Sequence, residues 1–171
     1  MVTLAQLIAE AAFLEGFDVK TSELHGLSQR GGSVETHVRY GKKINSPLVE
    51  KADLIISLEI LESLRKTNYL DKETKFLINN YSLPYSSSPS EEETLKMLDK
   101  LKNKKYIVEA SKICQQKLGQ EVISGVYLLG FAVNKGLIRL KPESVLEAIK
   151  NLLPEKYRKI NEQAFELAQK E

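Results

Sequence analysis

The first part of the chain places apolar residues at helical spacing. From Leu4 to Ala12 they recur at steps of three and four, and Gly16 follows as a natural stop. The opposite side of the same segment is nearly as apolar. The pattern therefore predicts a well-buried helix over residues 2–15, with no strand before it.

Two segments that follow alternate apolar and polar residues, which is the pattern of half-buried strands. They cover residues 17–21 and 33–40. In the second segment, Glu35, His37 and Arg39 share the face opposite the apolar residues. We therefore expect His37 to lie on a polar face, as a surface or interface residue rather than as a catalytic base.

Near-continuous apolar runs come next, at residues 52–58 and 75–80, with a shorter one at 106–110. Such runs indicate strands that are buried on both faces, as in a parallel sheet. Helical patterns separate them, and the helix expected over residues 91–101 has the sequence of a capping box, in which Ser90 precedes Glu93 by three positions.

The last third of the chain shows helical patterns only, over residues 122–135, 142–153 and 160–170. Strands that alternate with helices, followed by helices alone, predict an α/β protein. We expect a three-layer, Rossmann-like α/β/α domain with a helical C-terminal part. A chain of 171 residues is of single-domain size, so residues 1–171 are predicted to form one domain.

Between the two alternating segments lies a polar stretch that is richer in functional groups than a plain turn requires. Arg30 stands beside Gly31 and Gly32, and offers a guanidinium next to accessible amide donors, a combination suited to phosphate or carboxylate. The alternative is a surface loop whose charges face water. The candidate ligand-binding or partner-binding residues are Glu23, His25, Gln29, Arg30, Gly31 and Gly32.

No catalytic set stands out in the sequence. Glu23 and His25 lie two positions apart and would form an acid/base pair, but no nucleophile or metal partner accompanies them. Ser28 lies near His25 without a third orienting group. The chain also lacks the nucleophile-elbow, Walker A and zinc-type spacings. We therefore assign no catalytic residue.

Composition narrows the function classes further. Lys+Arg 25 against Asp+Glu 23 gives a net charge of +2, which argues against nucleic acid and membrane surfaces as partners. No apolar run approaches the roughly 20 residues of a membrane helix, and the absence of a basic region before the first apolar stretch predicts no signal peptide, so we expect a cytoplasmic protein. The single cysteine, Cys114, excludes an iron–sulfur cluster or a cysteine-based zinc site within this chain, and its helical setting favours a small buried residue.

An ordered set of motifs gives a more specific indication. It comprises Leu7–Ala12, Glu15–Glu23, His25–Val34, His37–Gly41, Ser46–Leu48, Ala52–Glu59 with Glu62 and Arg65, Leu128–Gly130 and Asn161–Phe165. In this set the chain resembles the gamma-type subunits of the 2-oxoacid:ferredoxin oxidoreductases, and among them the small subunits of the indolepyruvate type. The resemblance extends over residues 2–170.

The resemblance implies a division of labour. Enzymes of this family oxidatively decarboxylate a 2-oxoacid to an acyl-CoA and pass the electrons to ferredoxin. In the indolepyruvate type, thiamine diphosphate and the iron–sulfur clusters belong to a large partner subunit. This chain would then be an accessory subunit without a cofactor of its own. Arg30, Gly31 and Gly32 would contact coenzyme A or the large subunit, with His25 and Gln29 bonding the same partner and Glu23 orienting His25 or pairing with Arg30.

One departure from the family pattern concerns the N-terminus. Members of the family usually begin with a strand and a loop of the type G-x-G-G-Q-G, and neither precedes the helix at Val2 here. Either the true start of the protein lies upstream of Met1, or this form lacks that element, whose loop would supply an anion site at the helix start. A missing inner strand would also leave a sheet edge where another chain, including a second copy, would pair.

A different class of function remains open at this point. The same α/β pattern suits a free-standing binding module or a homo-oligomeric interaction protein without any redox partner. The departure from the family pattern at the N-terminus slightly favours that alternative.

Overall fold

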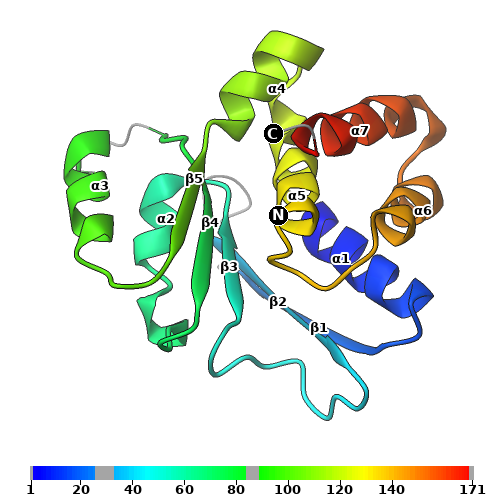
Figure 1. Cartoon of the computed structure of the whole chain (residues 1–171), viewed down its shortest axis with the longest axis horizontal. Helices are drawn as coiled ribbons and strands as arrows, with labels where there is room; N and C mark the ends of the chain where they lie inside the picture. The colour runs from blue at the N-terminus through cyan, green and yellow to red at the C-terminus, as the bar shows by residue number, and fades with distance from the viewer. Residues whose placement is uncertain (1, 26–32, 84–88, 170–171) are drawn as a thin grey trace. The chain divides into compact units, whose positions relative to one another are not determined.

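The computed structural model describes residues 2–25, 33–83 and 89–169 (Figure 1). The chain divides into two compact units. The first comprises Met1–Val49 and Gly125–Glu171, and the second comprises Glu50–Ser124. This division does not test whether the two units form the single domain predicted over residues 1–171, which stays a prediction.

The second unit is built on a parallel sheet. Its strands lie in the order β3-β4-β5, and β4 pairs with both neighbours. Helices α2 and α3 lie on one side of these strands in Figure 1. The elements are β3 (Leu54–Ser57), α2 (Ile60–Leu64), a 3-10 turn (Thr67–Tyr69), β4 (Lys75–Asn79), α3 (Glu91–Asp99), β5 (Lys105–Val108), α4 (Ala110–Leu118) and a second 3-10 turn (Glu121–Ile123). This alternation confirms the predicted α/β class.

Local signals in the sequence place several ends of these elements. The predicted capping box is present, because the Glu93 amide donates to Ser90 Oγ at 3.2 Å and the Ser90 amide donates to Glu93 Oε2 at 2.8 Å. Helix α4 ends at Gly119, whose φ of 72° is the left-handed conformation that glycine adopts most easily.

A buried amide ties the strand ends of this unit together. Asn79, at the end of β4, is 1% exposed. Its Nδ2 donates to the Leu58 carbonyl oxygen at 3.0 Å and to Ser111 Oγ at 2.8 Å, while its Oδ1 accepts from the Ser111 amide at 3.1 Å. These bonds join the segment after β3 to the start of α4. One buried apolar cluster of the unit comprises Ile55, Ile60, Phe76, Ile78 and Leu98.

In its described residues, the first unit combines a hairpin with four helices. Strands β1 (Asp18–His25) and β2 (Val34–Gly41) pair antiparallel, from Asp18 opposite Gly41 to His25 opposite Val34. The helices are α1 (Val2–Leu14), α5 (Ser124–Asn134), α6 (Pro142–Leu152) and α7 (Glu155–Ala168), which confirms the predicted helical C-terminal part. Strand β1 runs farther than predicted, so Glu23 and His25 belong to the hairpin rather than to a loop.

Helices α5 and α7 approach each other closely at a glycine. A Cβ added to Gly130 would overlap the backbone carbonyl oxygen of Phe165 and lie 3.1 Å from Ala168 Cβ. On the same helix α7, the buried Asn161 donates from Nδ2 to the Tyr157 carbonyl oxygen at 2.8 Å. The C-terminal motifs that carry the family resemblance are therefore packing motifs.

Two predictions about burial are wrong. Helix α1 is not buried all round, because Phe13 is 68% exposed and Leu14 43% exposed, whereas Leu4, Leu7, Ile8, Ala11 and Ala12 are buried. His37 is 7% exposed, and is therefore not a surface residue. The segment after β2 supplies a hydrogen-bond donor to its ring, as described below, so its polar atoms are satisfied within the unit.

The remaining predictions about single residues concern Cys114 and membrane helices. Cys114 is fully buried, as expected. None of the helices in the described ranges combines the length and the apolar character needed to cross a bilayer.

Candidate functional site

The structure places only part of the predicted binding segment. Gln29, Arg30, Gly31 and Gly32 lie outside the described residues, and so does the side chain of His25. His25 itself ends β1 and pairs with Val34. Whether Arg30 and the two glycines bind an anion therefore stays a prediction, and so does an acid/base pair of Glu23 with His25.

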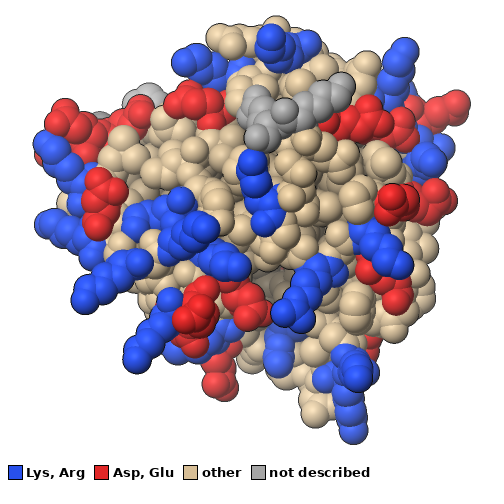
Figure 2. Space-filling view, viewed as in Figure 1, with Lys and Arg blue, Asp and Glu red and all other residues tan. Residues whose placement is uncertain are grey.

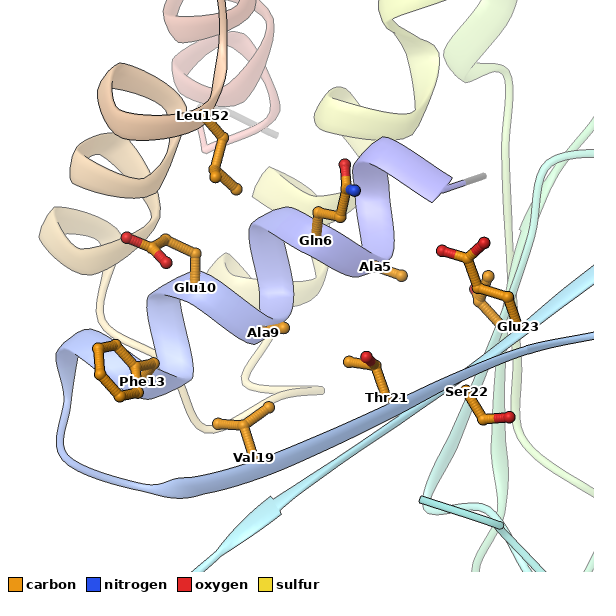
Figure 3. A pocket seen from close by; sticks show the side chains of 11 residues that line it. Ala5, Gln6, Ala9, Glu10, Phe13, Val19, Thr21, Ser22, Glu23 and Leu152 are labelled. Atoms are coloured by element: carbon orange, nitrogen blue, oxygen red, sulfur yellow. The ribbon is translucent and has the colours of Figure 1, made fainter.

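Glu23 is the candidate residue that the structure describes, and it lines a groove. We call this cavity of about 510 Å³ the α1–β1 groove. In Figure 3, β1 runs below α1, and Thr21 and Val19 point from the strand toward the helix. The lining residues are Ala5, Gln6, Ala9, Glu10, Phe13, Val19, Thr21, Ser22, Glu23, Thr36 and Leu152.

Simple periodicity explains why these residues face one another. Ala5, Ala9 and Phe13 follow at four-residue steps and so share one side of α1, over about 12 Å at 1.5 Å per residue. Val19, Thr21 and Glu23 share one face of β1, over about 13 Å at 3.3 Å per residue. Helix and strand therefore form two walls of nearly equal length, and Leu152 of α6 completes the rim.

The charged residues of the groove are both acidic. Glu10 Oε1 accepts a hydrogen bond from Asn151 Nδ2 at 3.0 Å, which fixes one carboxylate on the helix wall. Within the described ranges, Glu23 makes no hydrogen bond or ion pair through its side chain. No lysine or arginine is among the described residues that line the groove. The groove is thus apolar at the Phe13 end and anionic along its helix wall and at the Glu23 end.

The β2 strand holds the segment that leads out of this unit. Arg39 Nη1 donates to the carbonyl oxygens of Ser46 and Leu48, at 2.9 and 3.1 Å. The Val49 amide donates to His37 Nδ1 at 3.1 Å, so that ring nitrogen carries no proton. His37 Nε2 lies 2.6 Å from Glu35 Oε1 and donates to it. The buried histidine therefore has a structural task rather than a catalytic one.

A second hydrogen bond fixes the start of the same segment. The Ile44 amide donates to Asp18 Oδ2 at 2.8 Å. This bond is the main cause that lowers the pKa of the Asp18 carboxyl below its ordinary value of 3.8, with a smaller contribution from Lys20. The hairpin and residues 44–49 are thus joined by side-chain to backbone bonds at both ends.

The carboxyl ends of the parallel strands in the second unit are a further place where α/β proteins bind ligands. Here Asn80 Nδ2 donates to Glu91 Oε1 at 3.2 Å and to Glu109 Oε1 at 2.6 Å. Tyr81 donates to Glu121, a bond that raises the pKa of the Tyr81 hydroxyl. The carboxylates of Glu91, Glu109 and Glu121 at this edge therefore already accept hydrogen bonds from donors within the chain. Across the face drawn in Figure 2, acidic and basic side chains are interspersed.

Sequence reasoning missed most of the groove. The apolar outer face of α1 is its signal in the sequence: that pattern predicts burial, but Phe13 on that face is exposed. The contribution of Leu152 had no local signal, because it depends on how α6 packs against α1.

Comparison with known proteins gives the family. The model of the family described as pyruvate ferredoxin/flavodoxin oxidoreductase matches residues 1–171. Indolepyruvate oxidoreductase subunit IorB of Pyrococcus horikoshii is 32% identical, over 99% of this chain and 89% of that protein. The same subunit of Archaeoglobus fulgidus is 33% identical, over 97% of this chain and 86% of that protein. The pyruvate/ketoisovalerate oxidoreductases common subunit gamma of Pyrococcus abyssi is 31% identical, over 98% of this chain and 90% of that protein.

Two solved structures share the fold. The gamma subunit of a keto/oxoacid ferredoxin oxidoreductase from Geobacter sulfurreducens superposes with a TM-score of 0.68 at 16% identity, covering 98% of this chain and 88% of that one. Pyruvate oxidoreductase subunit PORC from Thermotoga maritima gives a TM-score of 0.71 at 20% identity, covering 98% of this chain and 87% of that one. The Rossmann-like α/β class is confirmed by this similarity. The predicted role as a subunit of a 2-oxoacid oxidoreductase is confirmed as well, and the chain belongs to the pyruvate ferredoxin/flavodoxin oxidoreductase family.

Proposed function

We propose that this chain is the accessory subunit of an indolepyruvate-type 2-oxoacid:ferredoxin oxidoreductase, and that it works only in complex with a large subunit. The observation that carries the proposal is the similarity to the IorB subunits, which extends over nearly the whole chain in relatives from four organisms. The relatives named as gamma subunits of pyruvate and ketoisovalerate enzymes make an aliphatic 2-oxoacid the second candidate substrate.

The cofactors are proposed to belong to the partner subunit. When bound there, thiamine diphosphate supplies the carbanion chemistry of decarboxylation, and the clusters carry the electrons to ferredoxin. An iron–sulfur cluster takes about four cysteine thiolates, whereas this chain has one cysteine. That residue is buried, and burial raises the pKa of the Cys114 thiol to about 11. The residues of this chain therefore do not fit a cluster.

The segment between β1 and β2 is proposed to face the large subunit or coenzyme A. Arg30 with the amides of Gly31 and Gly32 suits a phosphate of coenzyme A or a carboxylate of the partner. Replacement of Arg30 by alanine distinguishes the two roles. A higher KM for coenzyme A in an intact complex supports ligand contact, whereas a weaker complex with an unchanged KM supports partner contact. A variant that changes neither quantity excludes both.

Co-expression tests the proposal as a whole. The chain is produced with and without an indolepyruvate-type large subunit, and viologen reduction is assayed with indolepyruvate and coenzyme A, then with pyruvate and 2-oxoisovalerate. We expect a complex that co-purifies and an activity that needs this chain. A chain that stays alone and leaves the activity unchanged would contradict the proposal, and would favour a free-standing or homo-oligomeric binding module.

A further inference from the structure

We propose that the α1–β1 groove binds an apolar segment of the large subunit of the oxidoreductase complex, and that a lysine or arginine of that segment pairs with Glu23. The inference rests on the proposed function, because it requires a partner chain. It adds the place of contact on this chain and the chemistry of the segment that fills it.

Large apolar side chains of the groove are exposed to solvent. Phe13 is 68% exposed and Leu152 is 43% exposed, and both line the cavity together with Val19. Figure 3 shows Phe13 and Val19 near one end of the groove and Leu152 above it. An aromatic side chain gains several times more from burial than a small residue does, and aromatic residues are typical anchors at protein interfaces. Phe13 is therefore the expected anchor of the contact.

Charge sets the chemistry of the occupant. Glu10 and Glu23 both line the groove, and the described lining residues include no cation. Two carboxylates along walls about 12 Å long disfavour an anionic ligand such as a phosphate, and favour a cation. Glu10 already accepts a bond from Asn151, whereas the side chain of Glu23 has no partner among the described residues, so Glu23 is the carboxylate expected to pair with the segment. This preference separates the groove from the Arg30 segment, whose chemistry suits an anion.

Shape favours a peptide over a small molecule. Pockets for small ligands bury roughly 70–90% of the ligand surface, whereas the most prominent wall residue here, Phe13, is itself 68% exposed. The walls match about two turns of a helix or four residues of a strand in length. A polypeptide that continues beyond both ends can fill such an open groove and still bury much of its own surface elsewhere.

Photo-crosslinking in the assembled complex tests where the groove makes contact. Phe13 is replaced by the photoreactive residue benzoylphenylalanine, the complex with the large subunit is purified and irradiated, and the crosslinked peptide is sequenced by mass spectrometry. We expect a peptide of the large subunit, with bulky apolar residues and a lysine or arginine within about one helical turn of the crosslink. A crosslink within the same chain, one to a second copy, or none at all in a formed complex would overturn the proposal.

Binding measurements on variants test the chemistry of the contact. Phe13→Ser and Glu23→Lys are each expected to raise the Kd for the large subunit by about tenfold or more. The controls are Val122→Ser, at an 86% exposed site outside the groove, and Glu166→Lys, at an exposed acid on α7. Both should stay within about twofold of the parent chain. Equal loss in the controls, or none in the groove variants, would refute the proposed contact.

The salt dependence of the Kd distinguishes a charge pair of Glu23 with the large subunit from a merely structural role of Glu23, which would leave that dependence unchanged. Raising the ionic strength should weaken the parent complex more than the Glu23→Gln complex, because the variant lacks the charge to be screened. A complex that forms and is active, but tolerates every groove variant, refutes this inference and leaves the proposed function standing. If no complex with the large subunit forms, both fail.

Discussion

Gly130 lets helix α5 approach helix α7, and replacing it with alanine tests that packing directly. The new methyl group would overlap the Phe165 carbonyl oxygen, which is backbone and cannot rotate away. Overpacking of this kind costs about 1–3 kcal/mol. Alanine in the interior of a helix would return about 0.5–1 kcal/mol through its higher propensity. Because the overlap is with backbone, the cost should fall in the upper half of the overpacking range, at about 2–3 kcal/mol, and we expect a net loss of roughly 1–2.5 kcal/mol in the free energy of unfolding.

Urea unfolding of the parent chain and of Gly130→Ala, at equal m-value, measures this loss. The second neighbour, Ala168 Cβ, lies at 3.1 Å, and Ala168→Gly in the same chain removes it without touching the carbonyl. The double variant should therefore recover only a small part of the loss. Gln163→Ala, at an exposed position of α7, serves as the control and should change stability by less than about 0.5 kcal/mol. Full rescue by Ala168→Gly, or a Gly130→Ala chain that is as stable as the parent, would refute the backbone overlap.

Three further predictions concern single residues. Asn79→Ala removes hydrogen bonds to Leu58 and Ser111 at a site that is 1% exposed, and should cost about 2–4 kcal/mol in urea unfolding; a cost below about 0.5 kcal/mol would show that these bonds contribute little. The pKa of Asp18 is lowered in the folded chain, so its contribution to stability is present above the ordinary value of 3.8 and is lost as the pH falls below it. The difference in urea midpoint between the parent chain and Asp18→Asn should therefore shrink as the pH is lowered through that range, and a difference that stays constant would contradict the assignment. The buried Cys114 thiol, with its pKa raised to about 11, should react with iodoacetamide at pH 8 only after unfolding, and rapid labelling of the folded chain would contradict its burial.

Much of the second unit could be predicted from the sequence, because its signals are local. The apolar runs around Ile55 and Ile78 are typical of strands in a parallel sheet, and the capping box at Ser90 needs only neighbouring residues. The strand β1 was predicted too short, because Ser22 and Glu23 have low strand propensity. Pairing with β2, in which Glu23 lies opposite Thr36, outweighs that local preference.

In the first unit, the burial of His37 and the α1–β1 groove could not be predicted from the sequence. His37 lies on the polar side of its strand by alternation, but the Val49 amide and Glu35 satisfy its ring nitrogens, so burial is not penalised. That outcome depends on a segment that lies twelve positions away. The groove has the same origin, because Phe13, Glu23 and Leu152 meet only when α1, β1 and α6 are packed.

Reconstitution measures the central claim most directly. The large subunit is held at a fixed concentration, this chain is added stepwise, and the rate of viologen reduction by indolepyruvate and coenzyme A is followed. If the chain is an accessory subunit of the enzyme, the rate rises from a low baseline and reaches a plateau at a fixed molar ratio. A large subunit that is fully active alone, with a rate that does not respond to added chain, would contradict the account.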